Sequence, residues 1–327
     1  MSVADQHPAD ISLEEARRLV QRAVDKAEQL GLRGGIAVVG ASGALVSASR
    51  LDHGGPGGMA RATSKAWISA TQQIPSSEHL QRMVHLPAPI SAGFVACSPQ
   101  AAFPGAGGIP ILDADGVVVG GIAASGATVS PFLPEGVAPE AVSAEGEPAN
   151  PEDLLIAYAL EVRYVGQHGD DRAKWEQRFG DLVVAPEDSL GMKPAPAASR
   201  QRQLSWARDV TDRAIEAARG RGLRVSVAVV DAGGDPVQQD RMDGAPAGGV
   251  EVALATAATA ARFGVNGAAL GARYGAQVGA LAALSPLPFL AVPGAEPVVV
   301  DGHLVAAVGI GGADPSACAD IAAQVVS

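Results

Sequence analysis

The fold of this chain is decided by a stretch that occurs twice, GLRGGIAVVGASGALVSASRLDHGGPGG at 31–58 and GLRVSVAVVDAGGDPVQQDRMDGAPAGG at 222–249. At a constant offset of 191 residues (222 − 31), 13 of these 28 positions are identical without a gap. A second block repeats at an offset of 186, where GVVVGGI at 116–122 aligns with GHLVAAV at 302–308. Because loops absorb small changes in length, we interpret the chain as a tandem duplication of one small domain.

The same order of elements is expected in each copy. In the first copy, Ser12 and Glu15 form a capping-box pattern, and apolar residues then recur at helical spacing until Gly31. The pattern further predicts strands at 36–39, 44–49, 93–97, 110–112 and 117–123, and helices at 59–72 and 151–164. Short connections between strands favour antiparallel pairing, so the expected fold is α+β: two profilin-like copies, each a mostly antiparallel five-stranded sheet covered by helices.

The copies are separated by segments that do not repeat. We expect copy 1 at 12–165, with an insertion at 130–150 that is rich in Pro, Ala, Gly and Glu, and copy 2 at 203–327. A linker is expected at 166–202. The two copies are expected to pack as a pseudo-dimer, which could assemble further into a homo-oligomer.

Composition excludes several classes of partner. There are 35 acidic and 24 basic side chains, a net charge of −11, which argues against nucleic-acid and anionic-membrane surfaces. No run of about 18 apolar residues is present, so no membrane span is expected. The two cysteines, Cys97 and Cys318, form no CxxC pair, and the first ten residues show no signal-peptide pattern. A cytoplasmic protein with a small-molecule ligand is expected.

Three motifs carry a resemblance to a known family. They are Ala-Val-Val-x-Ala-x-Gly at 37–43 and 228–234, the Arg-(Leu/Met)-Asp that follows it before a Gly-rich helix entry, and PILDADGVVVGGIAASGA at 110–127. Together they resemble the GlcG/HbpS-like, or haem-degrading, domain family, which includes the C-terminal domain of PduO-type proteins. The resemblance implies homo-oligomers and a recurring association with haem or cobalamin chemistry. Copy 1 departs from the pattern with Gly40 where copy 2 has Asp231, and with His53 where copy 2 has Gly244.

Three residues of the first copy are candidates for chemistry. His53 adjoins the glycine loop and could act as an acid, a base or an iron ligand. Lys65 lies on an Ala-rich helix where copy 2 has Thr256, and it could bind an anion or act as a base if desolvated. Arg61 lies one helical turn earlier on the same face. Each has a simpler alternative, namely an exposed loop histidine or a charged side chain on a solvated helix face.

A second set of candidates is assigned to ligand binding: Arg50, Asp52, His85, Ser125, Arg241 and Asp243. The planar guanidinium of Arg50 suits a carboxylate or a propionate. The presence of the Arg and Asp in both copies, as Arg50 with Asp52 and Arg241 with Asp243, favours the alternative of a local structural pair that fixes the Gly-rich loop. Ser125 is replaced by Gly311 in copy 2, so its hydroxyl matters only in copy 1.

Three functions remain open at this stage. The first is a small-molecule-binding protein whose ligand is haem or a related tetrapyrrole, with His53 or His85 as axial ligand. The second is a cofactor-independent isomerase, tautomerase or lyase that acts on a small organic acid or ring compound. The third is a non-catalytic assembly subunit. No HExxH motif and no dinucleotide fingerprint is present, so neither a dedicated zinc site nor a nucleotide cofactor is expected.

Overall fold

The computed structural model describes residues 10–29, 32–98, 102–103, 105–126, 151–162, 203–284 and 288–326. The predicted insertion at 130–150 and the predicted linker at 166–202 lie outside these residues. By its contacts the chain divides into two compact units, Met1–Ala44 with Leu51–Arg200, and Leu45–Arg50 with Gln201–Ser327. Each unit combines helices with antiparallel strands, which confirms the α+β class.

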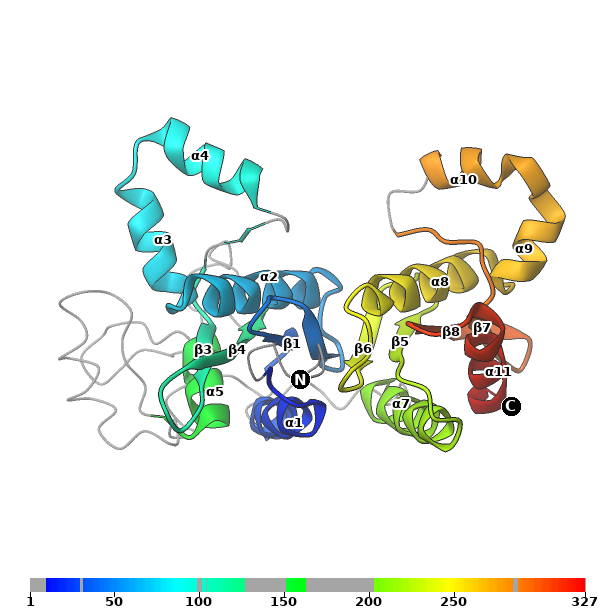
Figure 1. Ribbon diagram of the computed structural model, residues 1–327, viewed down its shortest axis with the longest axis horizontal. Helices are drawn as coiled ribbons and strands as arrows, with labels where there is room; N and C mark the ends of the chain where they lie inside the picture. Colours follow the sequence, from blue (N-terminus) through cyan, green and yellow to red (C-terminus); the bar gives the residue numbers. More distant parts are fainter. Residues whose placement is uncertain are drawn as a thin grey trace, which may run out of the picture. The chain divides into compact units, whose positions relative to one another are not determined.

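Apart from the short 3-10 helix η3 of copy 2, the two copies contain the same elements in the same order (Figure 1). Copy 1 contains α1 (Leu13–Gln29), β1 (Gly35–Gly40), β2 (Leu45–Arg50), α2 (Gly57–Gln72), α3 (Ser76–Val84), α4 (Ala88–Cys97), β3 (Gly108–Leu112), β4 (Val118–Ser125) and α5 (Pro151–Leu160). Copy 2 contains α7 (Gln203–Gly220), β5 (Ser226–Asp231), β6 (Pro236–Arg241), α8 (Gly249–Phe263), α9 (Gly267–Tyr274), η3 (Gly275–Gln277), α10 (Val278–Leu284), β7 (Ala295–Val300), β8 (His303–Gly311) and α11 (Pro315–Val326).

The offset of 191 residues holds in three dimensions. It carries β1 onto β5 and β2 onto β6 without a shift at either end, and it carries α2 onto α8 to within one residue. The offset of 186 carries β4 onto β8 in the same way. Both copies therefore adopt the same secondary structure along the repeated stretches, and the predicted duplication is confirmed.

One predicted strand is wrong. Residues 93–97 belong to the helix α4, so among the described residues each copy contributes four strands rather than five. A short apolar run is compatible with either a buried strand or a helix, and Pro87 and Pro89 at the start of this one favour a helix N-terminus. None of the residues of α4 is buried.

Strand β2 joins the second unit, although its sequence belongs to the first copy. It pairs antiparallel with β6, and the second unit thus holds five strands in the order β2-β6-β5-β8-β7. The first unit holds three strands in the order β3-β4-β1, all antiparallel. The chain leaves the first unit after Ala44 and returns to it at Leu51.

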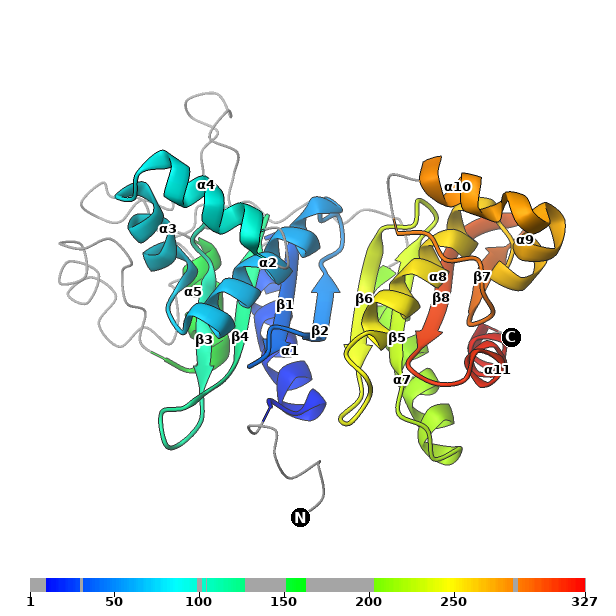
Figure 2. The ribbon, with the colours of Figure 1, turned by 45° about the horizontal axis from the view of Figure 1, so that its top comes forward.

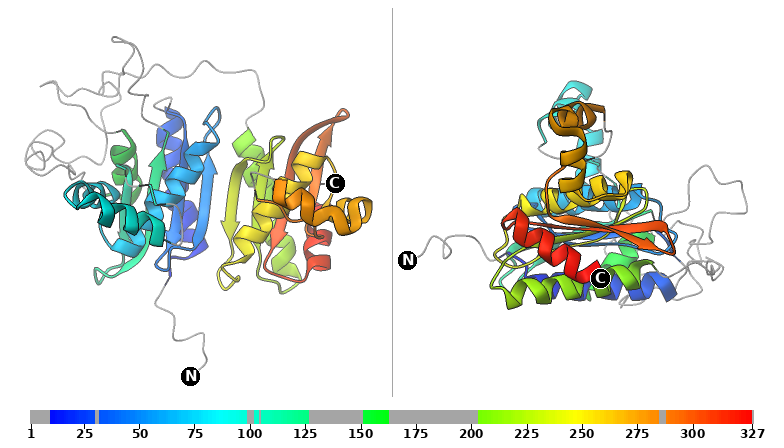
Figure 3. Two further views of the ribbon diagram at one scale, coloured as in Figure 1. Left: turned by 90° about the horizontal axis from the view of Figure 1, so that it is seen from above. Right: turned by 90° about the vertical axis from the view of Figure 1, so that its right-hand side faces the viewer.

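Helices cover both faces of each sheet, and the Ala-rich helices pack most closely. In the first unit α2 covers one face while α1 and α5 lie on the other (Figures 1 and 2). In the second unit α8 covers one face, with α7 and α11 opposite (Figure 3). Close packing depends on small residues: a Cβ at Gly121 would press into the backbone carbonyl of Ala66 on α2.

Each copy also carries a helical arm that extends from its Ala-rich helix. In copy 1 the arm consists of α3 and α4, and in copy 2 of α9, η3 and α10 (Figure 2). Among the described residues, none of the helices is long and apolar enough to cross a membrane.

Candidate functional site

A buried ion pair lies at the centre of the first unit. Lys65 on α2 donates from Nζ to Oε2 of Glu152 on α5 at 2.5 Å, and each side chain is only 4% exposed. Lys65 also donates to the carbonyl of Ala124 at 3.3 Å, and the other oxygen of Glu152 accepts from the N–H of Gly126 at 2.7 Å. Lysine and glutamate are rarely buried this completely unless they are paired. The pair therefore joins α2, α5 and the end of β4.

Further side chains bind the loop that covers this pair. Asp153 accepts from the N–H of Gly107 at 2.6 Å, and Ser76 accepts from the N–H of Gly108 at 3.0 Å. Ser64 accepts from the N–H of Phe103 at 2.7 Å, and the ring of Phe103 lies 5.8 Å from Nζ of Lys65. Lys65 is thus enclosed by protein, which corrects the alternative of a lysine on a solvated helix face.

Arg61 lies at the exposed edge of the same region, beside the buried Ser125. Arg61 is exposed, one turn before Lys65, and its Nε lies 3.4 Å from Oγ of Ser125, which is 2% exposed. The structure thus brings together three of the predicted residues, Arg61, Lys65 and Ser125, around the end of β4. Such a grouping of a guanidinium and a hydroxyl is suited to binding an anionic group.

Sequence analysis missed the acidic partners Glu152 and Asp153. Two signals could have found them. A lysine on an otherwise apolar helix needs a counter-ion if it is buried, and the predicted helix from Pro151 begins with two acidic residues in its first turn.

The second copy lacks both members of the ion pair. Thr256 takes the place of Lys65 and donates within its own helix, to the carbonyls of Val252 at 2.8 Å and Ala253 at 3.1 Å. Because Pro151 and Pro315 both begin the last helix of their copy, Ser316 occupies the position of Glu152. Gly311 replaces Ser125, and a Cβ there would press into the carbonyl of Gly249. The polar site is therefore specific to copy 1.

His53 lies in a tight turn between β2 and α2. Its side chain is exposed, and its backbone is left-handed, with φ of 64°. Its counterpart Gly244 has φ of 77°, so this turn needs a left-handed residue in both copies. Among the described residues, no hydrogen bond or ion pair joins His53 or His85 to Arg61, Lys65 or Ser125.

Replacing His53 by glycine is expected to raise the free energy of unfolding by up to about 1 kcal/mol. A left-handed conformation costs an L-residue roughly 1–2 kcal/mol, and the greater freedom of glycine in the unfolded chain cancels part of the gain. Urea denaturation of the full chain would measure the change. A clear loss of stability would show that the imidazole makes contacts that outweigh the backbone strain.

The arginines that the two copies share, Arg50 and Arg241, both make their contacts within the second unit. Arg50 is 6% exposed and donates to Oδ2 of Asp231 at 2.5 Å, while Arg241 donates to the carbonyls of Leu45 at 2.9 Å and Ala245 at 3.3 Å. These contacts give both arginines a structural role, but the partner of Arg50 is Asp231 of copy 2 and the acceptors of Arg241 are carbonyls, so the predicted local pairing with Asp52 and Asp243 stays a prediction.

The remaining predicted ligand residues lie on loops. Asp52 is half-buried beside His53, and Asp243 is exposed at the corresponding turn of copy 2. His85 is exposed in the short connection between α3 and α4. These three positions are therefore accessible.

A further histidine, His79 on α3, was given no role in the sequence analysis. It is 5% exposed, its ring centroid lies 4.7 Å from that of Phe94 on α4, and its Nε2 has no hydrogen-bond partner in the described part of the chain. Burial lowers the pKa of His79 below 6.5, and the nearby charge of Arg82 lowers it further. The imidazole is thus neutral at pH 7.

The low pKa of His79 predicts that the fold loses stability in mild acid. Below about pH 6.5 the unfolded chain binds a proton that the folded imidazole does not yet accept, so stability falls as pH drops from 7 towards 5. In the His79→Phe variant this part of the pH dependence is expected to disappear. Urea midpoints of both proteins at pH 7, 6 and 5 would measure it, and parallel curves would contradict the assignment.

In the described ranges, no group of three or more His, Cys, Asp or Glu side chains is arranged to hold a metal ion. The chain is thus a tandem of two α+β domains, with one polar cluster in the first copy. Residues 11–131 and 203–327 both match the family model described as haem degrading protein HbpS-like. Since these matches cover most of the chain, it belongs to the HbpS-like family.

Solved structures and curated proteins were compared with the chain as well. An HbpS double mutant from Streptomyces reticuli is 30% identical over 41% of this chain and 97% of its own, with a TM-score of 0.36. A PduOC:haem complex is 26% identical over 37% and 90%, with a TM-score of 0.35. The ORFY protein of Klebsiella pneumoniae is 20% identical over 40% and 95%, with a TM-score of 0.36. No curated protein matches the chain.

Proposed function

We propose that this chain is a small-molecule-binding protein whose ligand is haem or a related tetrapyrrole, bound on the α3–α4 arm of the first copy. Membership of a family described as haem degrading supports this ligand class. One observation carries the choice of surface: the arm exposes large apolar side chains beside an exposed histidine. Leu86 is 41% exposed, Ile90 56% and Val95 42%, and His85 lies next to Leu86.

The chemistry of a tetrapyrrole fits this surface. Its ring is flat and largely apolar, and the iron of haem takes an imidazole as axial ligand. Contiguous exposed apolar patches on a folded domain commonly mark binding sites, whereas single exposed apolar side chains do not. His85 is accessible and supplies the imidazole, while His79 behind it is a neutral imidazole whose Nε2 is unpartnered within the described residues.

The second copy does not offer the same combination. The sequence contains no histidine between 249 and 302, a range that includes the whole arm of copy 2. Leu270 of that arm is fully buried. The proposal therefore assigns one haem to each chain, on the first copy.

A cofactor-independent isomerase, tautomerase or lyase reaction, the alternative function, would use a different set of residues. Lys65 is 3% exposed and its Nζ is held by Glu152 and Ala124, so a substrate does not reach it. Such a reaction would then use the exposed Arg61 with Ser125 beside it, residues of α2 and β4 that do not belong to the arm. Haem binding and this chemistry can therefore be tested with different variants.

Haem titration followed by absorbance tests the proposal. The wild-type chain is expected to give a saturable Soret band, and His85→Ala is expected to shift its position and weaken binding at least tenfold. His79→Ala tests whether the buried imidazole contributes, and Arg61→Ala and His53→Ala are matched controls outside the arm. If the His85→Ala and His79→Ala variants both bind haem as tightly as the wild type, the proposal is overturned.

The apolar patch formed by Leu86, Ile90 and Val95 could instead be covered by another copy of the chain. Sedimentation of the wild type and of Ile90→Asp, each with and without haem, distinguishes haem binding from self-association. If Ile90→Asp binds haem normally and only changes the oligomeric state, the patch is an oligomer contact and the haem proposal fails for this surface.

A further inference from the structure

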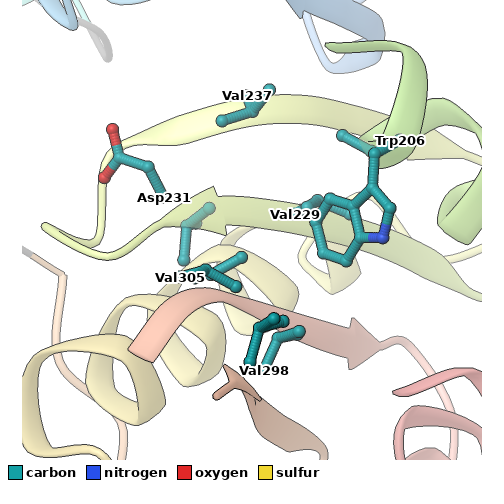
Figure 4. A pocket seen from close by; sticks show the side chains of 10 residues that line it. Trp206, Val229, Asp231, Val237, Val298 and Val305 are labelled. Carbon is teal, nitrogen blue, oxygen red and sulfur yellow. The ribbon is translucent and has the colours of Figure 1, made fainter. Parts of the chain in front are cut away.

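The second unit contains an apolar pocket that the proposed haem site does not use. It lies between α7 and the sheet, has a cavity volume of about 80 Å³ and is partly open to solvent. Figure 4 draws the indole of Trp206 beside Val229, with Val298 and Val305 on the neighbouring strands and Asp231 at the rim. Mainly apolar walls with a few polar groups at the rim are the usual character of small-molecule sites.

In the first copy the corresponding place is filled by the chain itself. The offset of 186 aligns Val119 and Gly120 with Val305 and Ala306, which line the pocket. Ile11 donates its N–H to the carbonyl of Val119 at 3.1 Å and is 6% exposed. Its Cγ2 lies 3.1 Å from where a Cβ at Gly120 would stand. An isoleucine therefore plugs the first copy's version of the pocket.

The turn that follows β1 in copy 1 and β5 in copy 2 is stabilised by a different aspartate in each copy. Asp10 accepts from the N–H of Ala41 at 2.7 Å and lies where a side chain at Gly40 would be. In copy 2 the residue aligned with Gly40 is Asp231, whose own carboxylate accepts from the N–H groups of Gly233 at 2.9 Å and Asp235 at 3.1 Å. Copy 2 thus stabilises this turn without a preceding aspartate.

Two sequence differences between the copies bear on this pocket. The offset of 191 aligns Ile11 with Arg202, so copy 2 has no isoleucine at the position of the plug, and Arg202 itself lies outside the described residues. The same offset aligns the half-buried Glu15 with Trp206, which adds an aromatic wall. Both differences favour a bound apolar group.

The first copy's plug defines the chemistry of the occupant. The sheet register skips Val119 opposite β3 and skips Val305 opposite β7, so both residues hold the same bulged position. A ligand that replaces Ile11 needs an apolar body and one hydrogen-bond donor for the Val305 carbonyl. Because the carboxylate of Asp231 already accepts from Arg50 and two backbone N–H groups, the pocket offers no unbalanced charge.

We infer that the second copy binds, between α7 and the β7–β8 hairpin, a neutral small molecule with a branched aliphatic or single aromatic body and one hydrogen-bond donor. This site is independent of the haem proposal, since its residues belong to the other copy. The haem titration and the test below can therefore fail separately.

The probes are benzyl alcohol, which has the body and the donor, and benzyl methyl ether, which lacks the donor. Nuclear magnetic resonance follows the methyl signals of Val229 and Val298 in the full chain. Benzyl alcohol is expected to cause saturable shifts, and the ether is expected to bind at least fivefold more weakly. Absence of saturable shifts with benzyl alcohol, or equal binding of the two probes, would overturn the inference.

Variants locate the binding. Ala306→Leu fills the pocket and is expected to weaken benzyl alcohol at least tenfold, while Val299→Ala, 55% exposed on the same strand as Val298 and outside the pocket, should stay within twofold. If Ala306→Leu does not fold, Trp206→Glu restores the first copy's residue and should cause the same loss. Unchanged binding in the folded pocket variant overturns the site. The site is also overturned if the wild type is a dimer and the pocket variant is a monomer, because the pocket would then be occupied by a second copy of the chain.

Discussion

Replacing Lys65 by alanine is expected to lower the free energy of unfolding of the first unit by about 3–5 kcal/mol. The change leaves Glu152 buried without its counter-ion, and removing one partner of a buried pair typically costs that much. Thermal and urea unfolding of the full chain, followed by circular dichroism, would measure it. A loss below about 1 kcal/mol would mean that Glu152 finds water or another partner when the lysine is removed.

The second copy supplies the matched control for this variant. Thr256 and Ser316 stand at the positions of Lys65 and Glu152, so the double variant Lys65→Thr/Glu152→Ser copies a combination that the same fold already contains. The double variant should lose clearly less stability than the sum of the two single variants, because neither charge is left alone. Additive losses would show that the two side chains stabilise the fold separately.

Replacing Gly309 by valine is expected to destabilise the second unit by at least about 3 kcal/mol. Gly309 lies on β8 directly beneath α8, and a Cβ there would press into the carbonyl of Ala253 and come within 2.9 Å of the nitrogen and the Cβ of Ala257. Overpacking of a well-packed core usually costs 1–3 kcal/mol, and backbone atoms can yield less than side chains. Loss of the cooperative transition of this unit in urea would be the measured effect.

Gly220→Ala is the control for the glycine variant. Gly220 ends α7, has no heavy atom within 4 Å of its would-be Cβ, and does not have a positive φ. Alanine there is expected to leave stability unchanged or to raise it by up to about 1 kcal/mol, because alanine has the higher helix propensity. If Gly309→Val behaves like Gly220→Ala, then α8 does not pack on β8 as closely as described.

Local patterns in the sequence were sufficient for the duplication and most of its elements. The repeat at 31–58 and 222–249 places β1, β2, β5 and β6, because short-range periodicity and turn residues decide where such strands begin and end. The error at 93–97 has a physical cause, since a short apolar run does not reveal whether it forms a strand or a helix. Its exposed position in α4 also could not be expected from apolar residues alone.

The candidate site was only half visible in the sequence. Lys65 and Ser125 were found because copy 2 replaces them with Thr256 and Gly311, and Arg61 because it lies one helical turn before Lys65. The sequence signals that Lys65 needs a counter-ion and that the helix from Pro151 begins with acidic residues, but only the fold brings Lys65 to Glu152, 87 residues away. His79 was missed for the same reason: its burial depends on Phe94 of the next helix.

By itself, the sequence determined that this protein is two copies of one α+β domain, since matching residues at a fixed offset must form matching elements. The tertiary structure alone decided which side chains are buried, paired or left facing a pocket. It placed Lys65 against Glu152, buried Ile11 in the first copy and formed, within the described residues, a pocket beside Trp206 in the second. These outcomes depend on packing between segments far apart in the chain, which local patterns do not encode.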